Sequence, residues 1–495
     1  MIPYIVAFLL LGLPIAISEW GMGKRGGRYG YNSTPGVFFA LTNRSRFGAY
    51  LGILGPLIPM MIYMYYVFVE AWCLGYAYKY LTGGMESVST AEGAVSFFGA
   101  FTGQDGNGIL FENPTSNAAV FLLFCFGLNF FLIYRGLSKG IEFFCKIAMP
   151  TLILCGLLIL IRVLTLPANI DNPDQNIVNG LGYMFNPYTN ETTLWQSLSN
   201  PDIWLAAAGQ IFFSLSIGFG IIITYASYLK KDDDIALSSV TAAAGNGFCE
   251  VCLGGLIVIP AAFVMLGPTA VEHAGDSSFS LGFITLPQVF DKMPLGEFVG
   301  FLFFFLLFLA AATSSISMLQ PAIAFFEEAL GLGRRASMAV LGFITVVGAW
   351  FVVYFSGGTK GVATIDFWMG EVGIFVLATI QVILFGWVLG IKKGKEEVDR
   401  GAEIPIPKFV MYIVKYVSPT YLLIVFGAWA YQNFYGNYVD PEKQSDSALY
   451  LIIHDRTTQF CVGLIILILI FLFLIIAEAV RRWERIEASQ EGAKL

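Results

Sequence analysis

The sequence predicts an all-α protein that crosses a membrane many times, and its composition carries this prediction first. The chain has 495 residues, of which 57% are hydrophobic and 13% are charged. A soluble globular domain carries about 25% charged residues, so the composition favours a polytopic membrane protein. The formal net charge is −7. No basic surface of the kind that binds nucleic acid is indicated, and we expect no nucleic-acid partner.

The distribution of apolar residues is the second observation. A membrane-spanning helix needs about 20 consecutive, mostly apolar residues. Eleven runs of this kind fall near residues 2–21, 51–81, 117–135, 141–166, 203–228, 236–266, 295–326, 337–355, 367–391, 408–432 and 450–480.

The loops between these runs differ in charge, which is the third observation. Lys24 and Arg28 follow the first run and Arg481 follows the last, whereas loops 82–116 and 167–202 hold acidic residues and neither Lys nor Arg. The positive-inside rule therefore predicts a cytoplasmic C-terminus. With eleven spans the N-terminus lies outside, and we expect a multi-pass protein of the plasma (inner) membrane.

The N-terminal residues enter the first apolar run directly. Met1-Ile2-Pro3-Tyr4 carries no flanking charge, and neither a basic region nor a small-residue cleavage site of a signal peptide follows. Two interpretations stay open: the chain starts outside the membrane, or a first span is missing from it.

The run at 203–228 contains residues that weaken a helix at bilayer depth. Ser214, Ser216, Gly218 and Gly220 follow each other closely, one turn after Gln210. Small residues of this kind also serve close helix packing, but there are more of them than packing requires. Free backbone groups are tolerated in a membrane only where they are buried in protein or line a cavity. We therefore favour a broken helix that marks a binding site.

Other polar residues inside the runs allow two interpretations each. Thr313-Ser314-Ser315 at mid-span could join helices or offer oxygen ligands to a hard cation. Asn246 and Glu250 lie four residues apart and therefore share one helix face. Glu250 could be structural, or a paired, protonated or proton-linked carboxyl group. Tyr65 and Tyr66 with Glu70 could be ordinary aromatic residues of a bundle interior.

The cysteines and histidines carry little chemistry. Cys249 and Cys252 form a CxxC pattern, but it lies in a membrane run without the β-α-β context of a redox motif. The chain contains only two histidines, which excludes a histidine-rich metal site.

Several stretches together resemble the neurotransmitter:sodium symporter family, and most closely its prokaryotic amino-acid transporters. The resemblance is collinear from residue 1 to about residue 480. The stretches that carry it are 1–27, 135–142, 146–150, 212–228, 281–287 and 313–321.

This resemblance implies a fold of two inverted five-helix repeats followed by two additional helices. It also implies that the chain begins at the family's second helix, so that the other broken helix is expected to be missing. The expected units are the first repeat at 1–166, an extracellular loop at 167–202, the second repeat at 203–391, two C-terminal helices at 392–480 and a cytoplasmic tail at 481–495.

The resemblance also implies a substrate site around the broken helix. Tyr66 matches the tyrosine whose hydroxyl holds the substrate carboxylate, and Met318 closes the apolar side of the pocket. The substrate-binding residues expected in this way are Ile62, Tyr66, Phe213, Ser216, Phe219, Ser314 and Met318.

Two sodium sites and a set of gates are implied in the same way. Glu250 takes the place of chloride in the chloride-independent type and is a candidate proton carrier. One sodium site involves Ser214 and Asn246; the second involves Ala310, Thr313 and Ser314. The gate residues are Asp366 on the outside and Glu328, Ser227 and Tyr228 on the inside. Gly140 and Pro150 match the motif that lets the family's fifth helix unwind.

The sequence therefore predicts sodium-coupled symport of a small neutral, hydrophobic amino acid by alternating access, independent of chloride. Na⁺, the amino acid and the lipid bilayer are the expected partners. The alternative is a truncated membrane protein that does not transport and has a receptor-like or structural role. An enzyme is not expected, because no nucleophile–base pair or metal motif is visible.

Overall fold

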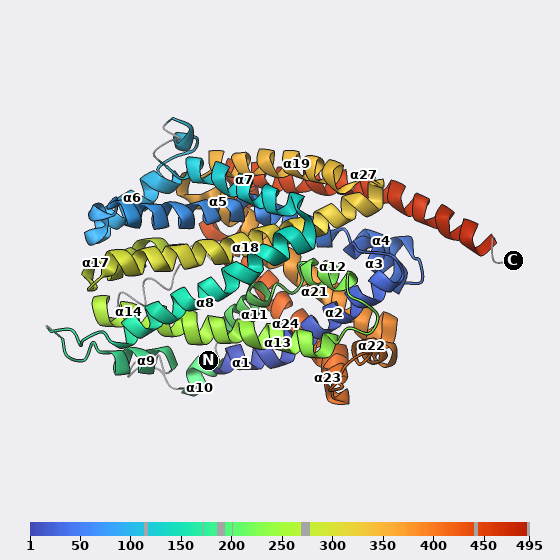
Figure 1. Ribbon diagram of the computed structural model, residues 1–495, viewed down its shortest axis with the longest axis horizontal. Coiled ribbons are helices and arrows are strands. Elements are labelled where there is room, and N and C mark those ends of the chain that lie inside the picture. Colours follow the sequence, from blue (N-terminus) through green and yellow to red (C-terminus); the bar gives the residue numbers. More distant parts are fainter. Residues whose placement is uncertain are drawn as a thin grey trace.

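The computed structural model describes residues 1–112, 117–170, 172–185, 194–199, 201–268, 278–439 and 444–492. Within these residues the regular structure is helical throughout, with no strand (Figure 1). Most helices run along the long axis of the molecule and form one bundle.

Each of the eleven predicted apolar runs contains an apolar helix of the described chain. Nine helical segments of the described chain are long and apolar enough to cross a membrane: Ile2–Arg28, Arg46–Thr82, Leu137–Leu164, Ile235–Leu266, Gly296–Leu330, Arg334–Tyr354, Gly357–Val398, Lys408–Val439 and Arg456–Arg485. The other two runs contain the shorter apolar helices Ala118–Tyr134 and Ala206–Leu215. The second of these is short because its helix is interrupted.

Two long helices, α5 (Leu54–Thr82) and α18 (Gly296–Leu330), pack against each other along their length. The helices α7 (Ala118–Tyr134) and α19 (Arg334–Tyr354) cover them on one side (Figure 1). The buried faces of α5 and α18 are almost entirely apolar. Burial of such side chains stabilises their contact by dense packing.

A second group of helices lies on the other side of α18. It comprises α1 (Ile2–Ala7), α2 (Leu13–Arg28), α11 (Pro201–Leu215), α12 (Ile221–Ser227) and α13 (Ile235–Phe248). Helix α2 packs on α12 and α13, and α1 packs on α11. The first helix and the broken helix are therefore neighbours in space although about 200 residues separate them.

The remaining helices surround these two groups. Between α5 and α18 in the sequence lie α6 (Ala91–Thr102), α8 (Phe143–Leu164), α9 (Ile177–Phe185), α10 (Leu194–Ser199), α14 (Leu256–Leu266), α16 (Ser278–Ser280) and α17 (Leu286–Lys292). After α19 follow α20 (Lys360–Ile365), α21 (Ile374–Ile383), α22 (Ile391–Val398), α23 (Lys408–Tyr412), α24 (Ser418–Tyr431), α25 (Asn437–Val439), α26 (Ala448–His454) and α27 (Arg456–Gly492). The short helices α3 (Thr34–Leu41) and α4 (Arg46–Leu51) connect α2 to α5. Single π-type turns occur within several spans, among them η4 (Leu137–Glu142), which holds Gly140, whereas Pro150 lies inside α8.

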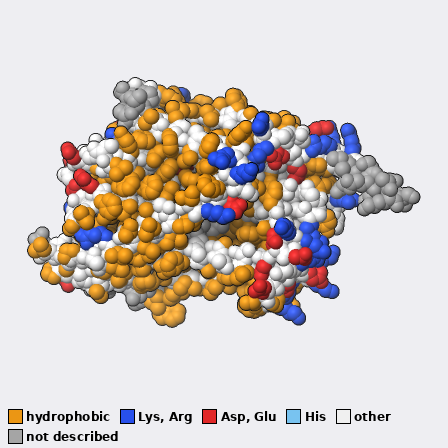
Figure 2. Space-filling view, viewed as in Figure 1, with side chains coloured by type: hydrophobic (Ala, Val, Ile, Leu, Met, Phe, Trp, Pro, Cys, Tyr) orange, Lys and Arg blue, Asp and Glu red, His pale blue; other side chains and the backbone are white. Residues whose placement is uncertain are grey.

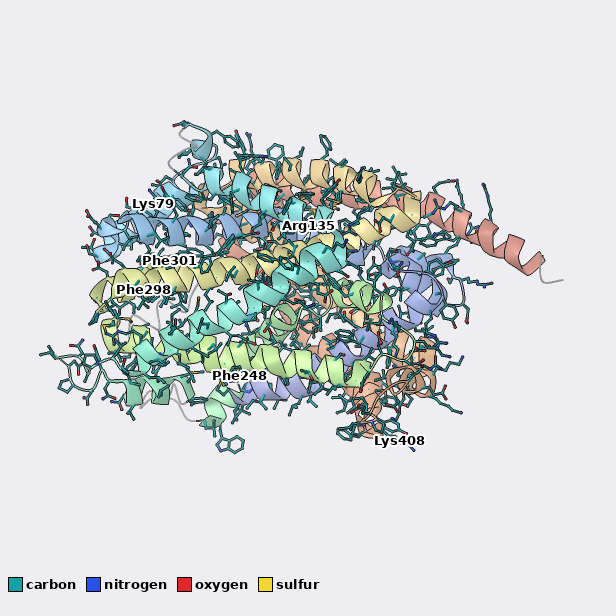
Figure 3. All side chains as sticks on the ribbon, in the orientation of Figure 1. Lys79, Arg135, Phe248, Phe298, Phe301 and Lys408 are labelled. Carbon is teal, nitrogen blue, oxygen red and sulfur yellow. The ribbon has the colours of Figure 1, made fainter. Side chains whose placement is uncertain are left out.

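The surface of the molecule divides into an apolar band and charged ends (Figure 2). Lysine and arginine gather at the end that carries α3, α4, α22 and α23, where Lys408 lies (Figure 3). We call this end, with Lys24, Arg46, Lys392, Lys408 and Arg482 among its residues, the basic end. The opposite end carries α6, α9 and α17 (Figure 1).

Candidate functional site

The polar centre of the molecule is built around the interruption between α11 and α12. Helix α11 ends at Leu215 and α12 begins at Ile221. In the segment between them the backbone φ is +54° at Ser216, +78° at Gly218 and +76° at Gly220. Left-handed backbone of this kind favours glycine and costs other residues about 1–2 kcal/mol. The helix break that the serines and glycines predict is present.

Gly218 fixes the position of the broken segment against α2. Its amide donates a hydrogen bond to a carboxylate oxygen of Glu19 at 2.9 Å. A Cβ atom at Gly218 would lie 2.7 Å from the carbonyl oxygen of Ile374. Both the left-handed φ and the close backbone approach therefore require glycine at this position.

Glu19 lies beside the broken segment, and the sequence did not single it out. Its side chain is fully buried, and its second carboxylate oxygen has no hydrogen-bond partner among the described residues. The signal in the sequence was a carboxylate inside an apolar run, because ionisable residues at membrane depth mark functional positions by default.

Glu250 is the centre of a network that joins three helical elements. Its carboxylate accepts hydrogen bonds from the hydroxyls of Tyr4 at 2.7 Å and Ser214 at 2.6 Å, and from the Gln210 amide at 2.5 Å. The amide nitrogen of Asn246 donates to the Ser214 hydroxyl at 2.5 Å. The structure therefore brings Ser214, Asn246 and Glu250 together, and it adds Tyr4 and Gln210 as partners.

The remaining polar candidates come from α5 and α18. The side chain of Ser314 lies beside the Tyr66 hydroxyl. Thr313 donates a hydrogen bond to the Ala310 carbonyl at 2.9 Å on its own helix. Tyr66, Ala310, Thr313 and Ser314 are only partly buried at mid-helix, whereas most of their neighbours along α5 and α18 are buried.

Apolar candidates lie on the same helices and on the broken segment. Ile62, Phe219 and Met318 are buried. Phe213 is 37% exposed, and its ring lies 5.7 Å from that of Phe219 at an angle of 76°. An edge-to-face pair of this kind is favourable. Phe213 also lines a cavity of about 310 Å³ together with Gln210, Asp366 and Glu371.

Asp366, the residue expected at the outer gate, is held by a neutral donor. The Tyr65 hydroxyl donates to its carboxylate at 2.5 Å. Because Asp366 and Phe213 line the same cavity, Asp366 lies next to the broken helix. Tyr65, which the sequence left as a bundle-interior aromatic, is its hydrogen-bond partner.

Two of the three residues expected at the inner gate, Glu328 and Ser227, contact the turn between α2 and α3. The Glu328 carboxylate accepts the backbone amides of Asn32 at 2.7 Å and Ser33 at 3.0 Å. Ser227 donates to the Asn32 side chain at 3.1 Å. The hydroxyl of Tyr228 accepts a hydrogen bond at 3.1 Å from the amide of Gln320, which lies on α18 about two turns before Glu328.

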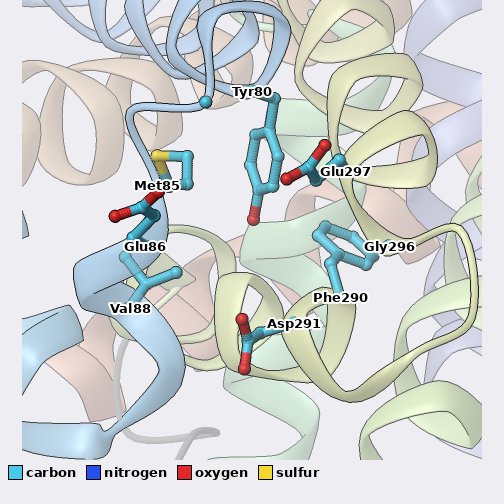
Figure 4. A pocket seen from close by; sticks show the side chains of 9 residues that line it. Tyr80, Met85, Glu86, Val88, Phe290, Asp291, Gly296 and Glu297 are labelled. Carbon is cyan, nitrogen blue, oxygen red and sulfur yellow. The ribbon is translucent and has the colours of Figure 1, made fainter.

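A separate cavity of about 210 Å³ lies at the opposite end from the basic end (Figure 4). It is lined by Tyr80, Glu86, Asp291 and Glu297 among others. The three carboxylates are exposed to solvent. Within the described residues no group of three or more His, Cys, Asp or Glu is arranged to hold a metal ion. None of the residues that line this cavity belongs to the network around Glu250, so the cavity is separate from the polar centre.

Comparison with known proteins identifies relatives over most of the chain. The sequence model of the Sodium:neurotransmitter symporter family matches residues 112–472. An uncharacterized sodium-dependent transporter of Methanocaldococcus jannaschii is 28% identical over 431 residues, which cover 86% of this chain and 82% of that protein. The Sodium- and chloride-dependent glycine transporter 2 of Xenopus laevis is 22% identical over 333 residues, covering 65% of this chain and 40% of that protein.

A solved structure shares the fold. The crystal structure of MhsT in complex with L-phenylalanine matches with a TM-score of 0.70 and 26% sequence identity. The match covers 86% of this chain and 90% of that one.

Proposed function

Because the chain belongs to the sodium:neurotransmitter symporter family, we propose that it is a sodium-coupled symporter of a small neutral, hydrophobic amino acid. The family and the relatives support sodium-coupled amino-acid transport, and the family is one of secondary transporters rather than enzymes. The observation that carries the proposal is the broken helix with Ser214, Asn246 and Glu250 gathered beside it.

The substrate pocket lies between the broken segment and the pair α5 and α18. Backbone groups at 216–220 and the Tyr66 hydroxyl receive the ammonium and carboxylate ends of the amino acid, with Ser216 and Ser314 beside them. Ile62, Phe213, Phe219 and Met318 surround its side chain. Since these four residues are apolar, a neutral hydrophobic side chain fits best. The structure that shares the fold was solved with L-phenylalanine, which supports this class of substrate.

One sodium site uses Ser214 and Asn246, next to the substrate carboxylate. A hydroxyl, an amide oxygen and backbone carbonyls freed by the helix break are the hard oxygen ligands that such a cation prefers. The second site uses the Ala310 carbonyl with the hydroxyls of Thr313 and Ser314. The substrate carboxylate offsets the charge of the first ion, and this couples substrate binding to the sodium gradient.

Glu250 makes transport independent of chloride in this proposal. Its carboxylate places a fixed negative charge beside the first sodium site, where a chloride-dependent protein would bind the anion. The three donors that hold it are neutral. In this proposal Glu250 takes up a proton when sodium leaves, which would return one proton across the membrane in each cycle.

Alternating access follows from movement of the α1–α2–α11–α12–α13 group against the rest of the bundle. We propose that the chain is organised as a repeat at 1–166, a loop at 167–202, a second repeat at 203–391, two helices at 392–480 and a tail at 481–495. Each repeat contributes helices to the moving group. Asp366 closes the site on the outer side, and Glu328, Ser227 and Tyr228 close it on the inner side. The basic end, with the C-terminus, faces the cytoplasm of a cell with this protein in its plasma (inner) membrane.

Binding of radiolabelled L-phenylalanine to the purified chain in lipid nanodiscs, titrated with Na⁺ at constant ionic strength with K⁺, tests the proposal. We expect sodium-dependent binding and about tenfold weaker sodium dependence in Ser214→Ala and Asn246→Ala, since each loses one oxygen ligand. Ser239→Ala is the control, because Ser239 lies on α13 but donates to the Ala236 carbonyl of its own helix. An unchanged sodium response in both site variants would refute the ion-site assignment.

A further inference from the structure

A cleft at the basic end lies between α22 and α23, apart from the polar centre. Its volume is about 520 Å³. It is lined by Ile391, Lys392, Lys395, Glu396, Asp399, Lys408, Met411 and Tyr412. From its lining and position we propose that this cleft binds the headgroup of an anionic phospholipid carrying a single phosphodiester.

The charged side chains of the cleft favour a ligand that carries one negative charge. Lys395 is already engaged, because it pairs with Asp399 and donates to the Ile406 carbonyl at 2.7 Å. Lys392 and Lys408 are exposed, and no hydrogen bond or ion pair to a described residue involves either side chain. Three lysines stand against the two carboxylates of Glu396 and Asp399. The remaining single positive charge suits a phosphodiester better than a more highly charged group.

The position of the cleft favours lipid over a free anion. It lies where the apolar band of the surface gives way to the basic end, and Lys408 projects there (Figures 2 and 3). Tyr412 is 54% exposed, and nearby Trp387 and Tyr416 are 56% and 49% exposed. Tryptophan and tyrosine gather at the headgroup level of a membrane. The Lys415 ammonium lies 4.8 Å from the centre of the Trp387 ring, which holds that ring at the boundary.

The opposite face of α22 is anchored to the helices around the broken segment. Glu397 is 1% exposed and pairs with Arg28 at 2.7 Å on α2. The Lys24 ammonium donates to the carbonyls of Asp233 at 2.8 Å and Arg400 at 2.7 Å. A headgroup in the cleft would therefore hold α23 to a segment that is fixed on α2 and on the turn after α12.

Measurement of the lipid that the protein retains tests the proposal without any transport assay. The purified chain is equilibrated with phosphatidylglycerol or phosphatidylcholine, and bound lipid is counted by native mass spectrometry. We expect the parent chain to retain phosphatidylglycerol. In Lys392→Gln/Lys408→Gln the affinity for this lipid should fall about tenfold or more, since each lysine near the membrane surface contributes to the attraction for anionic lipid. Phosphatidylcholine binding should differ little between the two.

Two further variants distinguish lipid binding in the cleft from general attraction of lipid to the basic surface. Lys230→Gln/Lys231→Gln removes the same charge from the basic end outside the cleft and should retain phosphatidylglycerol. Glu396→Gln removes a competing carboxylate and should strengthen retention a few-fold, an outcome that misfolding cannot produce. Equal loss in both lysine pairs, or unchanged affinity in the cleft pair, would overturn the proposal.

The source of the phosphate is tested separately. Inorganic phosphate and glycerol 3-phosphate at millimolar concentration should compete with phosphatidylglycerol only weakly. Full competition by either would show a free-anion site and would overturn the assignment to lipid. Because none of these measurements depends on sodium or an amino acid, their failure leaves the proposed transport function untouched, and the reverse holds as well.

Discussion

Carboxylates in the middle of the bundle and at the basic end are held by different kinds of partner. In the middle, Glu250 accepts hydrogen bonds from Tyr4, Ser214 and Gln210, all of them neutral. Glu19 is held in the same way by a backbone amide. These donors orient a carboxylate without cancelling its charge.

At the basic end the partners are cations. The buried Glu397 is surrounded by Arg28 at 2.7 Å, Arg25 at 3.5 Å and Arg400 at 3.8 Å. The more exposed Glu484 forms a two-point ion pair with Arg46, with both distances at 2.7 Å. The charges here are compensated within the protein.

This difference separates the proposed ion site in the middle from a structural cluster of ion pairs at the basic end. We call that cluster, Glu397 with Arg25, Arg28 and Arg400, the clamp. An uncompensated charge away from water is costly, so we expect a bound cation to stabilise the middle of the bundle. This fits the sodium site and the proton exchange that we propose there. The basic end needs no added ion for this purpose, and its pairs fix α2, α22 and α27 in place. We expect each region to keep its role when the other is altered.

The largest effect is expected for Gly218→Ala, which disturbs the middle of the bundle. The new methyl group would meet the Ile374 carbonyl at 2.7 Å, and alanine disfavours a φ of +78°. We expect loss of sodium-dependent amino-acid binding and a lowered melting temperature in nanodiscs. Gly209→Ala is the matched control, because Gly209 lies in α11 with no atom within 4 Å of an added Cβ. Near-normal binding by Gly218→Ala would show that the broken segment does not need this conformation.

A smaller but more specific effect is expected for Glu250→Ser. The change removes the negative charge beside the sodium site and leaves the donors Tyr4, Gln210 and Ser214 directed at the vacated place. We expect sodium-dependent binding to become chloride-dependent, with about a tenfold gain in apparent sodium affinity when gluconate is replaced by chloride. Glu371→Ser is the control, since Glu371 lines the cavity beside Phe213 and is not one of the groups bonded to Glu250. Indifference of Glu250→Ser to chloride would contradict the role given to Glu250.

The sequence predicted the middle of the bundle only where the pattern was local or the resemblance was strong. The spans follow from apolar runs, and the break follows from serines and glycines within a few residues. The shared face of Asn246 and Glu250 follows from their spacing of four. Tyr4 was missed because 246 positions separate it from Glu250, and no local pattern specifies such a contact.

The sequence predicted less of the structure at the basic end than in the middle of the bundle. The positive-inside rule located its charges, but their pairing depends on which helices meet. Glu397 and Arg28 are 369 residues apart. Helix α22 alone contains Lys392, Lys393, Lys395, Glu396 and Glu397, and only the packed structure shows which of these face α2. Side-chain pairing across distant segments is therefore what the sequence lacked in both regions.

An intermediate effect is expected when the clamp is broken. Glu397→Gln leaves buried or partly buried arginines without their carboxylate, a loss of about 3–5 kcal/mol for a fully buried pair. Because the arginines are 21–34% exposed, we expect about 1–3 kcal/mol of destabilisation. Sodium affinity should change less than about twofold, because the clamp lies outside the site.

Glu484→Gln is the matched control for the clamp. It breaks the exposed pair with Arg46, in which the side chains are 34% and 64% exposed, and should cost less than about 1 kcal/mol. Both variants are compared by chemical denaturation in the same lipid. Equal effects, or a large change of sodium affinity in Glu397→Gln, would contradict the separation between clamp and site.

The smallest effect is expected at Asp234, which joins the two regions at the start of α13. Its carboxylate accepts the amides of Leu237 at 2.8 Å and Glu403 at 3.0 Å. These hydrogen bonds, that from Leu237 first, lower the pKa of Asp234 below its ordinary value of 3.8. A carboxyl group with a lowered pKa in the folded state stabilises the fold above that ordinary value and loses this contribution as the pH falls through the lower one.

Asp234→Ala should therefore cost about 0.5–2 kcal/mol at neutral pH, as the loss of a helix N-cap does. Asp234→Asn keeps one of the two acceptor oxygens and should cost less. The difference in melting temperature between the parent chain and Asp234→Asn should shrink as the pH falls below about 4, and sodium-dependent binding measured at neutral pH should be unaffected by either change. A difference that grows on acidification would show that the Asp234 charge opposes folding and would contradict its role as a stabilising N-cap.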